Sequence, residues 1–388
     1  LYTYRQTSYH SAKGEECKSV AQGRATFLAK QIYSMARLWL SRKLKTEPPY
    51  LPILLLFVTN RCNLQCQMCG YCEKNVAQNK KSELTTEQWK EVLDSGHKLG
   101  TFLVSITGGE ALLREDIFDI LAHADALGMS THLCTNGTVV TEEIAHQLNE
   151  CGVNSVSVSL ESHEPKIHEE LRGKNTFKST INGIRLLLAH TPKARIGINY
   201  CITAKNFRDA HKMVPFAEEL GVHQLKFAPI HTNLQHRHRT LPLEDELVFS
   251  KEMLSELEEE TNKLAQAVEK SKLDTTSTMF LAGIPSLYSE QKSFYCFAGY
   301  VSCAVSPSGM VTPCCDMDSS LSVKDRPLEK IWHSEEFAAF REKVHTCQSP
   351  CWDTTNAELS LRLRLRSLWS HFGQTWRDIG FYISGGKK

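Results

Sequence analysis

The sequence predicts an α/β protein with a mainly parallel sheet, followed by a small cysteine-rich region. From residue 51 to about residue 230, short apolar runs alternate with stretches of helical periodicity, which is the pattern of repeated strand–helix units. Six of the 14 cysteines then fall within residues 294–355, where turn-forming residues are frequent. These observations predict one large α/β body and a smaller domain that follows it.

Six apolar segments are expected to form the strands. They are LLLFVT, FLVSIT, STHLCTN, SVSVSLE, RIGINYCIT and QLKFAPI, in chain order. The helices expected between them, such as residues 85–100, 116–128 and 141–152, each end in glycine, the usual helix stop. A parallel sheet built from such units is either open or closed as a barrel.

Helical segments also flank the body of the chain. Residues 24–44 and residues 357–384 place apolar side chains at steps of three and four, and residues 241–273 are a charged helical stretch. We therefore divide the chain into a basic amphipathic N-terminal helical extension (1–49), the strand–helix body (50–240), a helical connector (241–290), the cysteine-rich domain (291–355) and a basic amphipathic C-terminal helix (356–388).

Charge is unevenly distributed along the chain. The formal total is +1, but residues 1–50 carry a net +6 and residues 357–388 a net +4, so the body is acidic. The acidic body argues against nucleic acid as a partner. The basic ends predict a peripheral contact with an anionic membrane surface. The alternative is that both terminal helices pack on the body of the protein.

No apolar run reaches the roughly 18 residues that a membrane span needs. No secretory signal peptide is evident, and clustered cysteines in such a chain indicate metal binding in a reducing compartment. We therefore expect a cytoplasmic protein that is at most peripheral to the inner face of the membrane. Residue 1 is Leu, so the sequence leaves the natural N-terminus open.

Three cysteines in one tight loop form the strongest candidate site. Cys62, Cys66 and Cys69 directly follow the first expected strand. Thiolates at this spacing can bind three irons of a cubane cluster and leave the fourth iron open, as a catalytic site requires. The alternative is a zinc site that also uses Cys72. Four cysteines within eleven residues are too close for easy tetrahedral coordination, so we favour catalysis.

This C-x3-C-x2-C spacing resembles the hallmark of the radical S-adenosylmethionine (SAM) superfamily, and the resemblance covers about residues 50–235. It implies a partial parallel (β/α)6 TIM-like barrel in which a 4Fe-4S cluster on the three cysteines binds SAM. Such a cluster reductively cleaves SAM to a 5′-deoxyadenosyl radical, which abstracts hydrogen from a substrate. The resemblance also implies that Met68, before the third cysteine, packs on the adenine and that Cys72 is a bystander thiol.

Further segments resemble the family's SAM-contacting motifs in the expected order. SITGGEALL resembles the turn that meets the methionine amino group, and LCTNG resembles the end of the third strand. SVSLES resembles the end of the fourth strand, where polar side chains meet the ribose, and a weaker match lies in the fifth strand. The implied cofactor-binding residues are Gly108, Gly109, Glu110, Asn136, Ser159, Glu161 and Asn199.

A second cysteine group follows the pattern C-x12-G-x4-C from Cys296 to Cys314 and continues to Cys347 and Cys351. The turn residues 307–309 separate two apolar stretches and predict a hairpin with cysteines at its base. The pattern resembles the auxiliary-cluster domain called SPASM, or twitch in its reduced form. It implies one auxiliary 4Fe-4S cluster on these four cysteines, although the last pair is spaced C-x3-C rather than the usual C-x2-C. The alternative is a zinc hairpin.

Together these motifs predict a radical SAM enzyme that oxidises or rearranges a small, carbohydrate or lipid-linked metabolite. One alternative is a peptide or protein maturase, against which residues 1–50 look too short for a peptide-recognition domain. Another alternative is a non-catalytic zinc or iron–sulfur binding module. The enzyme interpretation also implies an external electron donor of the flavodoxin or ferredoxin type.

Overall fold

The computed structural model describes residues 33–70, 80–231, 243–289, 294–314, 316–349 and 351–363. The chain divides into two compact units, residues 1–49 and residues 50–388. In the first unit residues 33–44 are helical, as the sequence predicts. The earlier part of that expected helix and the expected C-terminal helix beyond residue 363 lie outside the described residues.

The second unit is built on one nine-stranded sheet in the order β7-β6-β5-β4-β3-β2-β1-β8-β9. Every neighbouring pair is parallel except β8 and β9. The six strands expected from the sequence are β1 to β6, so the predicted parallel α/β sheet is confirmed. The strands are β1 (Ile53–Phe57), β2 (Leu103–Thr107), β3 (Ser130–Thr135), β4 (Ser155–Ser159), β5 (Arg195–Ile202), β6 (Gln224–Pro229), β7 (Asp274–Thr275), β8 (Ser302–Val305) and β9 (Val311–Thr312).

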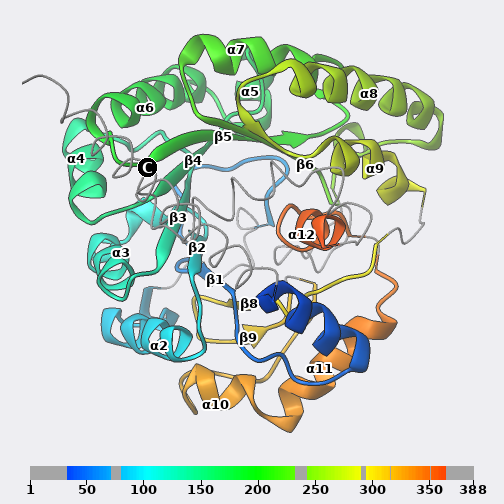
Figure 1. Ribbon diagram of the computed structural model, residues 1–388. Helices are drawn as coiled ribbons and strands as arrows, with labels where there is room; N and C mark the ends of the chain where they lie inside the picture. The colour runs from blue at the N-terminus through cyan, green and yellow to red at the C-terminus, as the bar shows by residue number, and fades with distance from the viewer. Residues whose placement is uncertain are drawn as a thin grey trace, which may run out of the picture. The chain divides into compact units, whose positions relative to one another are not determined.

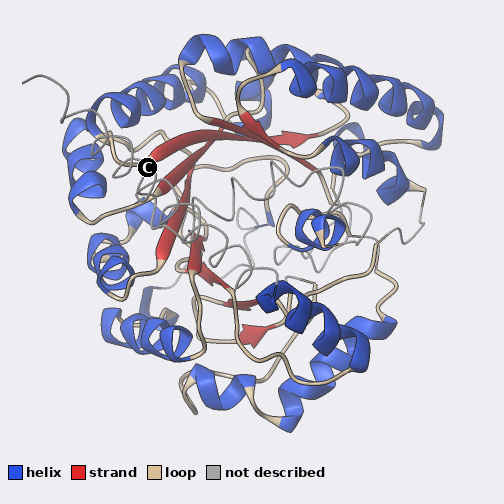
Figure 2. Ribbon diagram, viewed as in Figure 1, coloured by secondary structure: helices blue, strands red, loops and turns tan. Residues whose placement is uncertain are grey.

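Helices connect successive strands of the barrel and lie along the outer side of the curved sheet (Figure 1). Figure 2 shows the strands as an arc with these helices outside it. Gly100, Gly128 and Gly152 follow the first three of them with φ of +76°, +75° and +77°, the left-handed conformation that ends a helix. The helices are α2 (Thr86–Lys98), α3 (Ile117–Ala126), α4 (Glu142–Glu150), α5 (Pro165–Arg172), α6 (Thr176–His190), α7 (Met213–Leu220), α8 (Leu254–Lys270), α9 (Thr278–Tyr288), α10 (Leu328–Trp332), α11 (Glu335–Thr346) and α12 (Asn356–Arg362).

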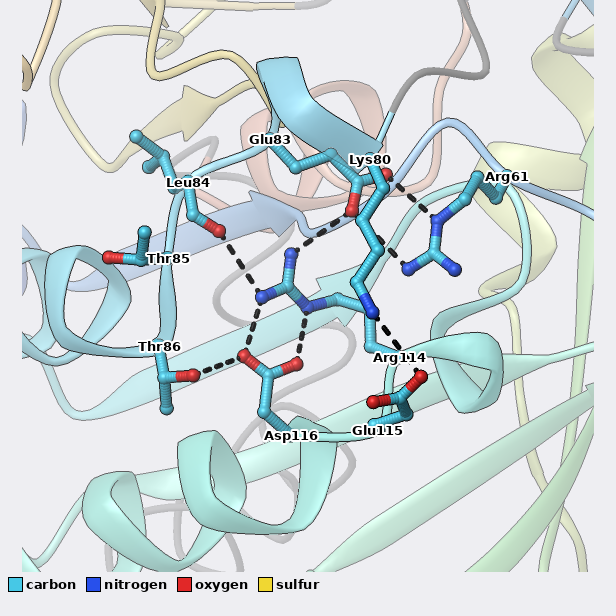
Figure 3. Close-up of a pocket in the computed structure, with 9 residues that line it drawn as sticks. All are labelled: Arg61, Lys80, Glu83, Leu84, Thr85, Thr86, Arg114, Glu115 and Asp116. Atoms are coloured by element: carbon cyan, nitrogen blue, oxygen red, sulfur yellow. Dashed lines mark hydrogen bonds and ion pairs between the residues drawn. The ribbon is translucent and has the colours of Figure 1, made fainter.

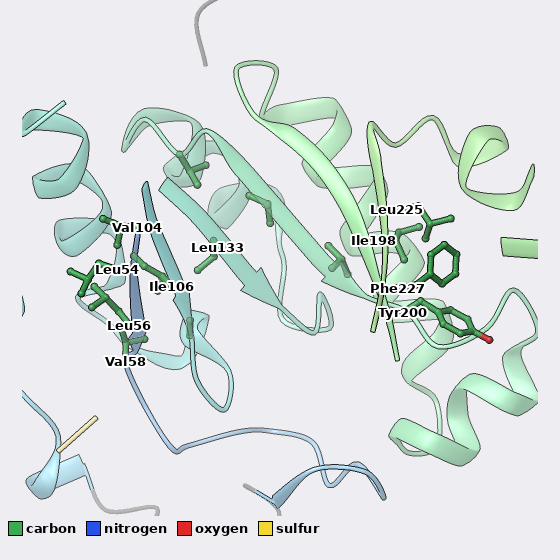
Figure 4. Packing of buried hydrophobic residues seen from close by; sticks show 14 of the residues in the cluster. Leu54, Leu56, Val58, Val104, Ile106, Leu133, Ile198, Tyr200, Leu225 and Phe227 are labelled. Atoms are coloured by element: carbon green, nitrogen blue, oxygen red, sulfur yellow. The ribbon is translucent and has the colours of Figure 1, made fainter. Parts of the chain in front are cut away.

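The two faces of the sheet are packed differently. Leu54 and Leu56 alternate along β1 toward the outer helices and are fully buried in the main core (Figure 4). Each such side chain stabilises the fold by about 1.5–3 kcal/mol. On the inner face Ile53 and Leu55 pack with Leu359 of α12. The inner face is therefore apolar where α12 covers it, at β1 and β8.

The cysteine-rich region adds two strands to the same sheet. Its first strand, β8, pairs in parallel with β1, with Ile53 opposite Ser302. β8 and β9 form the predicted hairpin, in which the Ser306 amide donates to the Met310 carbonyl (2.9 Å) and Gly309 has a φ of +94°. The pairing with β1 was not predicted. It joins the second cysteine region to the strand that leads into the first.

The connector is helical in part. Its 17-residue helix α8 carries several Glu and Lys residues, as the charged sequence predicts. Before it, residues 243–253 form only two short 3-10 turns, η6 (Asp245–Leu247) and η7 (Lys251–Met253). No helix in the described part of the chain is both long and apolar enough to span a membrane.

Candidate functional site

The first cysteine loop leaves the end of β1 and carries three thiols that influence one another. Cys66 is buried, and Cys62 and Cys69 are half-buried. Burial raises the pKa of Cys62 to about 11; a hydrogen bond from the Leu64 amide opposes the rise, and the charges of Cys66, Glu110 and Cys69 add to it. Deprotonating the three thiols together therefore needs a cation among them, and a bound iron–sulfur cluster supplies that positive charge.

The spacing of the three sulfur atoms bears on the zinc alternative. Zn–S bonds of about 2.3 Å in a tetrahedral site put pairs of sulfur atoms about 3.8 Å apart. The sulfur atoms of Cys62, Cys66 and Cys69 do not all lie within 4.8 Å of one another. Their spacing is therefore wider than that of a tetrahedral zinc site. Cys72, the fourth ligand of the zinc alternative, lies outside the described residues.

The Gly-Gly-Glu turn at the end of β2 supports the loop by direct backbone contact. The Gly109 amide donates to the Thr59 carbonyl (2.7 Å), and the Glu110 amide donates to the Arg61 carbonyl (2.8 Å). A Cβ on Gly108 or Gly109 would come within 3.0 Å of this loop backbone. The two glycines therefore allow the turn to touch the cysteine loop. Their predicted approach to SAM stays a prediction.

The Glu110 carboxylate is fully buried and bonded within the chain. It accepts hydrogen bonds from the Thr135 hydroxyl (2.8 Å), the Asn136 amide (2.7 Å) and the Leu112 amide (3.1 Å). Burial raises the pKa of this carboxyl, and the three hydrogen bonds oppose the rise. Glu110 thus joins the ends of β2 and β3. Its predicted contact with the SAM ammonium remains a prediction.

Asn136 connects the end of β3 to the residue after the first cysteine. Its Nδ2 donates to Oδ1 of Asn63 (2.8 Å), and Asn63 Nδ2 donates to the Thr138 hydroxyl (2.9 Å). Met68 is partly buried and packs against the main core. Both residues thus lie on or beside the cysteine loop, and their predicted SAM contacts remain predictions.

Glu161 and Arg172 form an ion pair next to Cys66, and of the two only Glu161 was a predicted site residue. Glu161, 1% exposed, accepts hydrogen bonds from Arg172 at Nε (2.9 Å) and Nη2 (2.5 Å) and from the Cys201 amide (2.6 Å). Arg172 Nη1 also lies 4.0 Å from the Cys66 sulfur. Glu161 was predicted to meet the ribose; the structure gives its carboxylate partners within the chain. Arg172 was missed because an arginine in the last turn of a helix is ordinary there.

Arg61, Glu83 and Arg114 belong to a charged cluster next to the residues that precede Cys62 (Figure 3). Glu83 is buried, accepts a hydrogen bond from the Thr59 hydroxyl and lies 3.4 Å from Arg61 Nε. Arg114, also buried, pairs with Glu83 (3.4 Å) and donates to the Val58 carbonyl (3.0 Å). Buried charges of this kind are stable only when paired and hydrogen-bonded. The cluster, which borders a cavity of about 290 Å³, fixes the loop just before Cys62.

The inner face of the sheet becomes polar away from α12. Ser159 and Asn199 lie opposite each other on β4 and β5, and Asn199 Nδ2 donates to the Cys134 sulfur (3.7 Å). On the neighbouring strands the His132 ring bonds the hydroxyls of Ser105 (3.1 Å) and Ser157 (2.9 Å).

Two groups of this inner polar row have a defined charge. Burial lowers the pKa of His132 to about 4, so its ring is neutral near pH 7. Lys226 on β6 donates to Asp274 (2.7 Å), and the pKa of Asp274 is lowered because Lys226 and Arg195 outweigh its burial. The predicted residues Ser159 and Asn199 therefore lie in a row of donors and acceptors that can bind a polar ligand.

The second cysteine region is assembled from separate segments. Burial raises the pKa of Cys351 well above its usual range, and the charges of Asp353, Asp316 and Cys296 add to the effect. Cys314 follows β9 and Cys347 ends α11, both half-buried. Cys303, which is not among the four cysteines implied as ligands, lies fully buried in β8 within the main core. Cys315 lies outside the described residues.

Comparison with protein families identifies both cysteine regions. Residues 56–214 match the radical SAM superfamily, and residues 296–353 match SPASM, an iron–sulfur cluster-binding domain. The chain belongs to the radical SAM superfamily. Radical SAM domains bind a 4Fe-4S cluster and SAM, and SPASM domains bind auxiliary iron–sulfur clusters. The predicted family, fold class and cofactors are thereby confirmed.

This radical SAM enzyme is similar in sequence to several named proteins and in fold to several solved structures. A PqqA peptide cyclase from Streptomyces rochei is 27% identical over 311 residues, covering 76% of this chain and 80% of the relative. An AdoMet-dependent heme synthase from Methanosarcina barkeri is 34% identical over 167 residues, covering 42% of this chain and 46% of the relative. The crystal structure of Streptococcus suis SuiB bound to precursor peptide SuiA has a TM-score of 0.62 at 17% identity, covering 78% of this chain and 69% of SuiB.

Proposed function

We propose that this radical SAM enzyme modifies a peptide or protein substrate. The observation that carries the proposal is the similarity to PqqA peptide cyclase, which covers 76% of the chain and extends well beyond residues 56–214. The match to the heme synthase covers only 42% of the chain and supports the shared SAM chemistry rather than a substrate. The maturase alternative is therefore better supported than the small, carbohydrate or lipid-linked metabolite that we predicted first.

The cluster-binding residues have separate roles in this proposal. Cys62, Cys66 and Cys69 would hold the 4Fe-4S cluster and would leave it one position open to SAM. Bound there, SAM supplies the radical chemistry that removes a hydrogen atom from the substrate. The turn 108–110 and Asn136 keep the cysteine loop in place during turnover. Arg172 donates toward the Cys66 sulfur, and hydrogen bonds to cluster sulfurs tune the reduction potential.

The inner polar row supplies the groups that bind SAM and the substrate. Ser159 and Asn199 are proposed for the SAM ribose because they pair across β4 and β5 on this face. His132 is neutral near pH 7 and offers one donor and one acceptor in addition to its neighbouring hydroxyls. A peptide backbone has both hydrogen-bond donors and hydrogen-bond acceptors. A row of side chains that offers both therefore suits a peptide backbone better than an apolar ligand.

The proposal is tested by transfer of deuterium from the substrate to 5′-deoxyadenosine. Reconstituted enzyme is incubated anaerobically with SAM, dithionite and perdeuterated peptides encoded by short reading frames near its gene. Mass spectrometry then measures deuterium in the 5′-deoxyadenosine and a mass change in the peptide. We expect both from one peptide, and neither with the Cys69→Ala variant.

A parallel incubation distinguishes the metabolite hypothesis. Deuterated small-molecule, sugar and lipid extracts replace the peptides under the same conditions. If deuterium enters 5′-deoxyadenosine from these extracts and from none of the peptides, the peptide proposal is wrong and our first prediction is restored.

Three further features belong to this proposal. The four cysteines matched in the second region suit one auxiliary cluster, and an external flavodoxin or ferredoxin would supply electrons. A peripheral membrane contact through the basic ends remains a prediction, because residues 1–32 and 364–388 lie outside the described residues. Flotation of the full-length protein with anionic vesicles at low salt tests it.

A further inference from the structure

Three metal-binding side chains meet on the outer side of the barrel and belong to neither cysteine region. Glu142 and His146 lie one turn apart on α4, and His190 lies in the last turn of α6, which packs beside α4 (Figure 1). One ligand atom from each side chain lies within 4.8 Å of the other two. Two imidazoles and one carboxylate are a ligand set that zinc uses in proteins.

The spacing of these ligand atoms suits an ion between them better than direct bonds. His146 Nε2 and His190 Nε2 lie 3.7 Å and 3.9 Å from the same oxygen of Glu142, Oε1. Both distances are too long for a hydrogen bond. Ligand atoms around a tetrahedral zinc ion are about 3.4 Å apart, because each lies about 2.0–2.2 Å from the metal. The two N–O distances are therefore close to those that a zinc ion requires.

The two histidine rings are held side by side by the helices that carry them. Their centroids are 4.6 Å apart, with an angle of 57° between the ring planes. The hydroxyl of Thr191, next to His190, donates to the carbonyl of Ala145, next to His146 (3.2 Å), and this bond is buried. It fixes the end of α6 against α4 directly beside the rings. Ligands whose backbones are already in place lose little conformational entropy when they bind a metal.

We propose that Glu142, His146 and His190 bind a zinc ion that ties α4 to α6. Water completes the tetrahedron, because the three side chains fill three of its four positions. Imidazole nitrogen favours zinc over magnesium, which prefers oxygen ligands. Since α4 precedes β4 and α6 precedes β5, the ion joins the helices that lead into the strands of Ser159 and Asn199. The inference depends neither on the substrate nor on the iron–sulfur clusters.

Zinc binding to the full chain with its iron–sulfur clusters loaded tests the site. Equilibrium dialysis is carried out anaerobically against zinc sulfate with magnesium in excess. Zinc and iron are measured in the same samples, so zinc that enters empty cysteine sites is detected as missing iron. We expect His146→Ala and His190→Ala each to bind this zinc at least about tenfold more weakly. His123→Ala is the matched control: His123 pairs with Asp94 (2.8 Å) but belongs to no group of three ligand atoms in the described part of the chain.

Two further measurements locate the ion. Added zinc should slow amide hydrogen exchange in α4 and at the end of α6 in the unaltered protein but not in His190→Ala, because the ion restrains local opening of the helices. Glu142→His should keep the zinc, since three imidazoles are also a zinc ligand set. Equal zinc affinity of the unaltered protein and His146→Ala, or zinc binding without slower exchange in α4, would overturn the proposal.

Discussion

The first cysteine region lies on one loop of eight residues from Cys62 to Cys69, whereas the second spreads over 56 residues from Cys296 to Cys351. The first is supported by its neighbours along one edge of the barrel: the ends of β2 and β3 and the end of α5 all bond to it. The second is brought together by packing between segments, such as Trp352 on α9. Backbone and side-chain hydrogen bonds from neighbouring strand ends hold the first region, whereas packing between distant segments holds the second.

The two regions should therefore be destabilised by different kinds of substitution. A loop fixed by backbone contacts fails when a neighbouring backbone is displaced. A site assembled from distant segments fails when any one segment no longer docks. Changes in the two regions should therefore have separable effects on iron content and on SAM cleavage, because distant sites without shared partners act nearly independently.

The largest effect is expected from Cys69→Ala. With one of three thiolates missing, iron should fall from about eight to about four per chain, and 5′-deoxyadenosine formation should stop. Iron and sulfide analysis and chromatography of the dithionite reaction measure both. Cys151→Ser is the matched control, because that buried thiol donates to the Leu148 carbonyl (3.3 Å) and belongs to neither cysteine region. SAM cleavage by Cys69→Ala would contradict the assignment of the first region.

Cys314→Ala should remove the auxiliary centre while SAM cleavage stays within about twofold of the unaltered enzyme. The reason is that Cys314 belongs to the second region alone. Cys303→Ala is the control, since that cysteine is buried in the core within β8. Loss of SAM cleavage in folded Cys314→Ala protein would mean that the two regions are not separable.

Gly109→Ala should damage the first region without removing a ligand. The added Cβ would overlap the Arg61 carbonyl, so we expect about 1–3 kcal/mol of destabilisation and loss of the first cluster. Gly128→Ala is the control: its φ is +75° but nothing lies within 4 Å, so only backbone strain of about 1–2 kcal/mol applies. Urea unfolding with iron analysis separates them, because only Gly109→Ala should lose iron.

Gly283→Ala is the corresponding change in the second region. Its Cβ would overlap Trp352 and displace the segment that carries Cys351, although alanine recovers about 1 kcal/mol of helix propensity. Iron in the auxiliary centre should fall while the first cluster stays loaded. The double variant Gly283→Ala/Trp352→Phe should restore part of the loss. Equal loss from both clusters would show that the regions are coupled.

The smallest effect concerns pH and the polar row beside the first region. Burial lowers the pKa of His132 to about 4 from a usual value of 6.5, so the unfolded chain takes up a proton that the folded chain does not. The contribution of His132 to the free energy of unfolding is therefore largest above pH 6.5. It decreases as the pH drops toward 4, and the decrease reaches about 1 kcal/mol by pH 5.5. His132→Asn should remove this part of the slope in urea unfolding. Parallel curves for both proteins would contradict it.

Local patterns made most of the barrel predictable. The six strands follow from runs of apolar residues, and the helix ends follow from glycines such as Gly100 and Gly128, because both signals lie within a few residues. The first cysteine site was recognisable for the same reason. Its ligands are close in sequence, so the spacing itself carries the geometry.

Contacts between distant segments, in contrast, leave no recognisable pattern in the sequence. Nothing around Arg172 in the sequence indicates a neighbouring cysteine, since it meets its partner only after the sheet has formed. Gly108 and Gly109 were recognised, but the backbone they touch could not be inferred. The pairing of β8 with β1 joins residues about 250 positions apart, and strand periodicity does not specify a partner at that distance.

That pairing gives the second region a role unrelated to metal. β1 is hydrogen-bonded to β2 on one edge and to β8 on the other, and its side chains are almost entirely apolar. Without residues 294–314, β1 would become an open apolar edge strand, which readily pairs with other chains and aggregates. A shortened enzyme that ends before residue 294 should therefore form insoluble aggregates even when iron is plentiful. Loss of the auxiliary centre through evolution would require another segment to cover this edge.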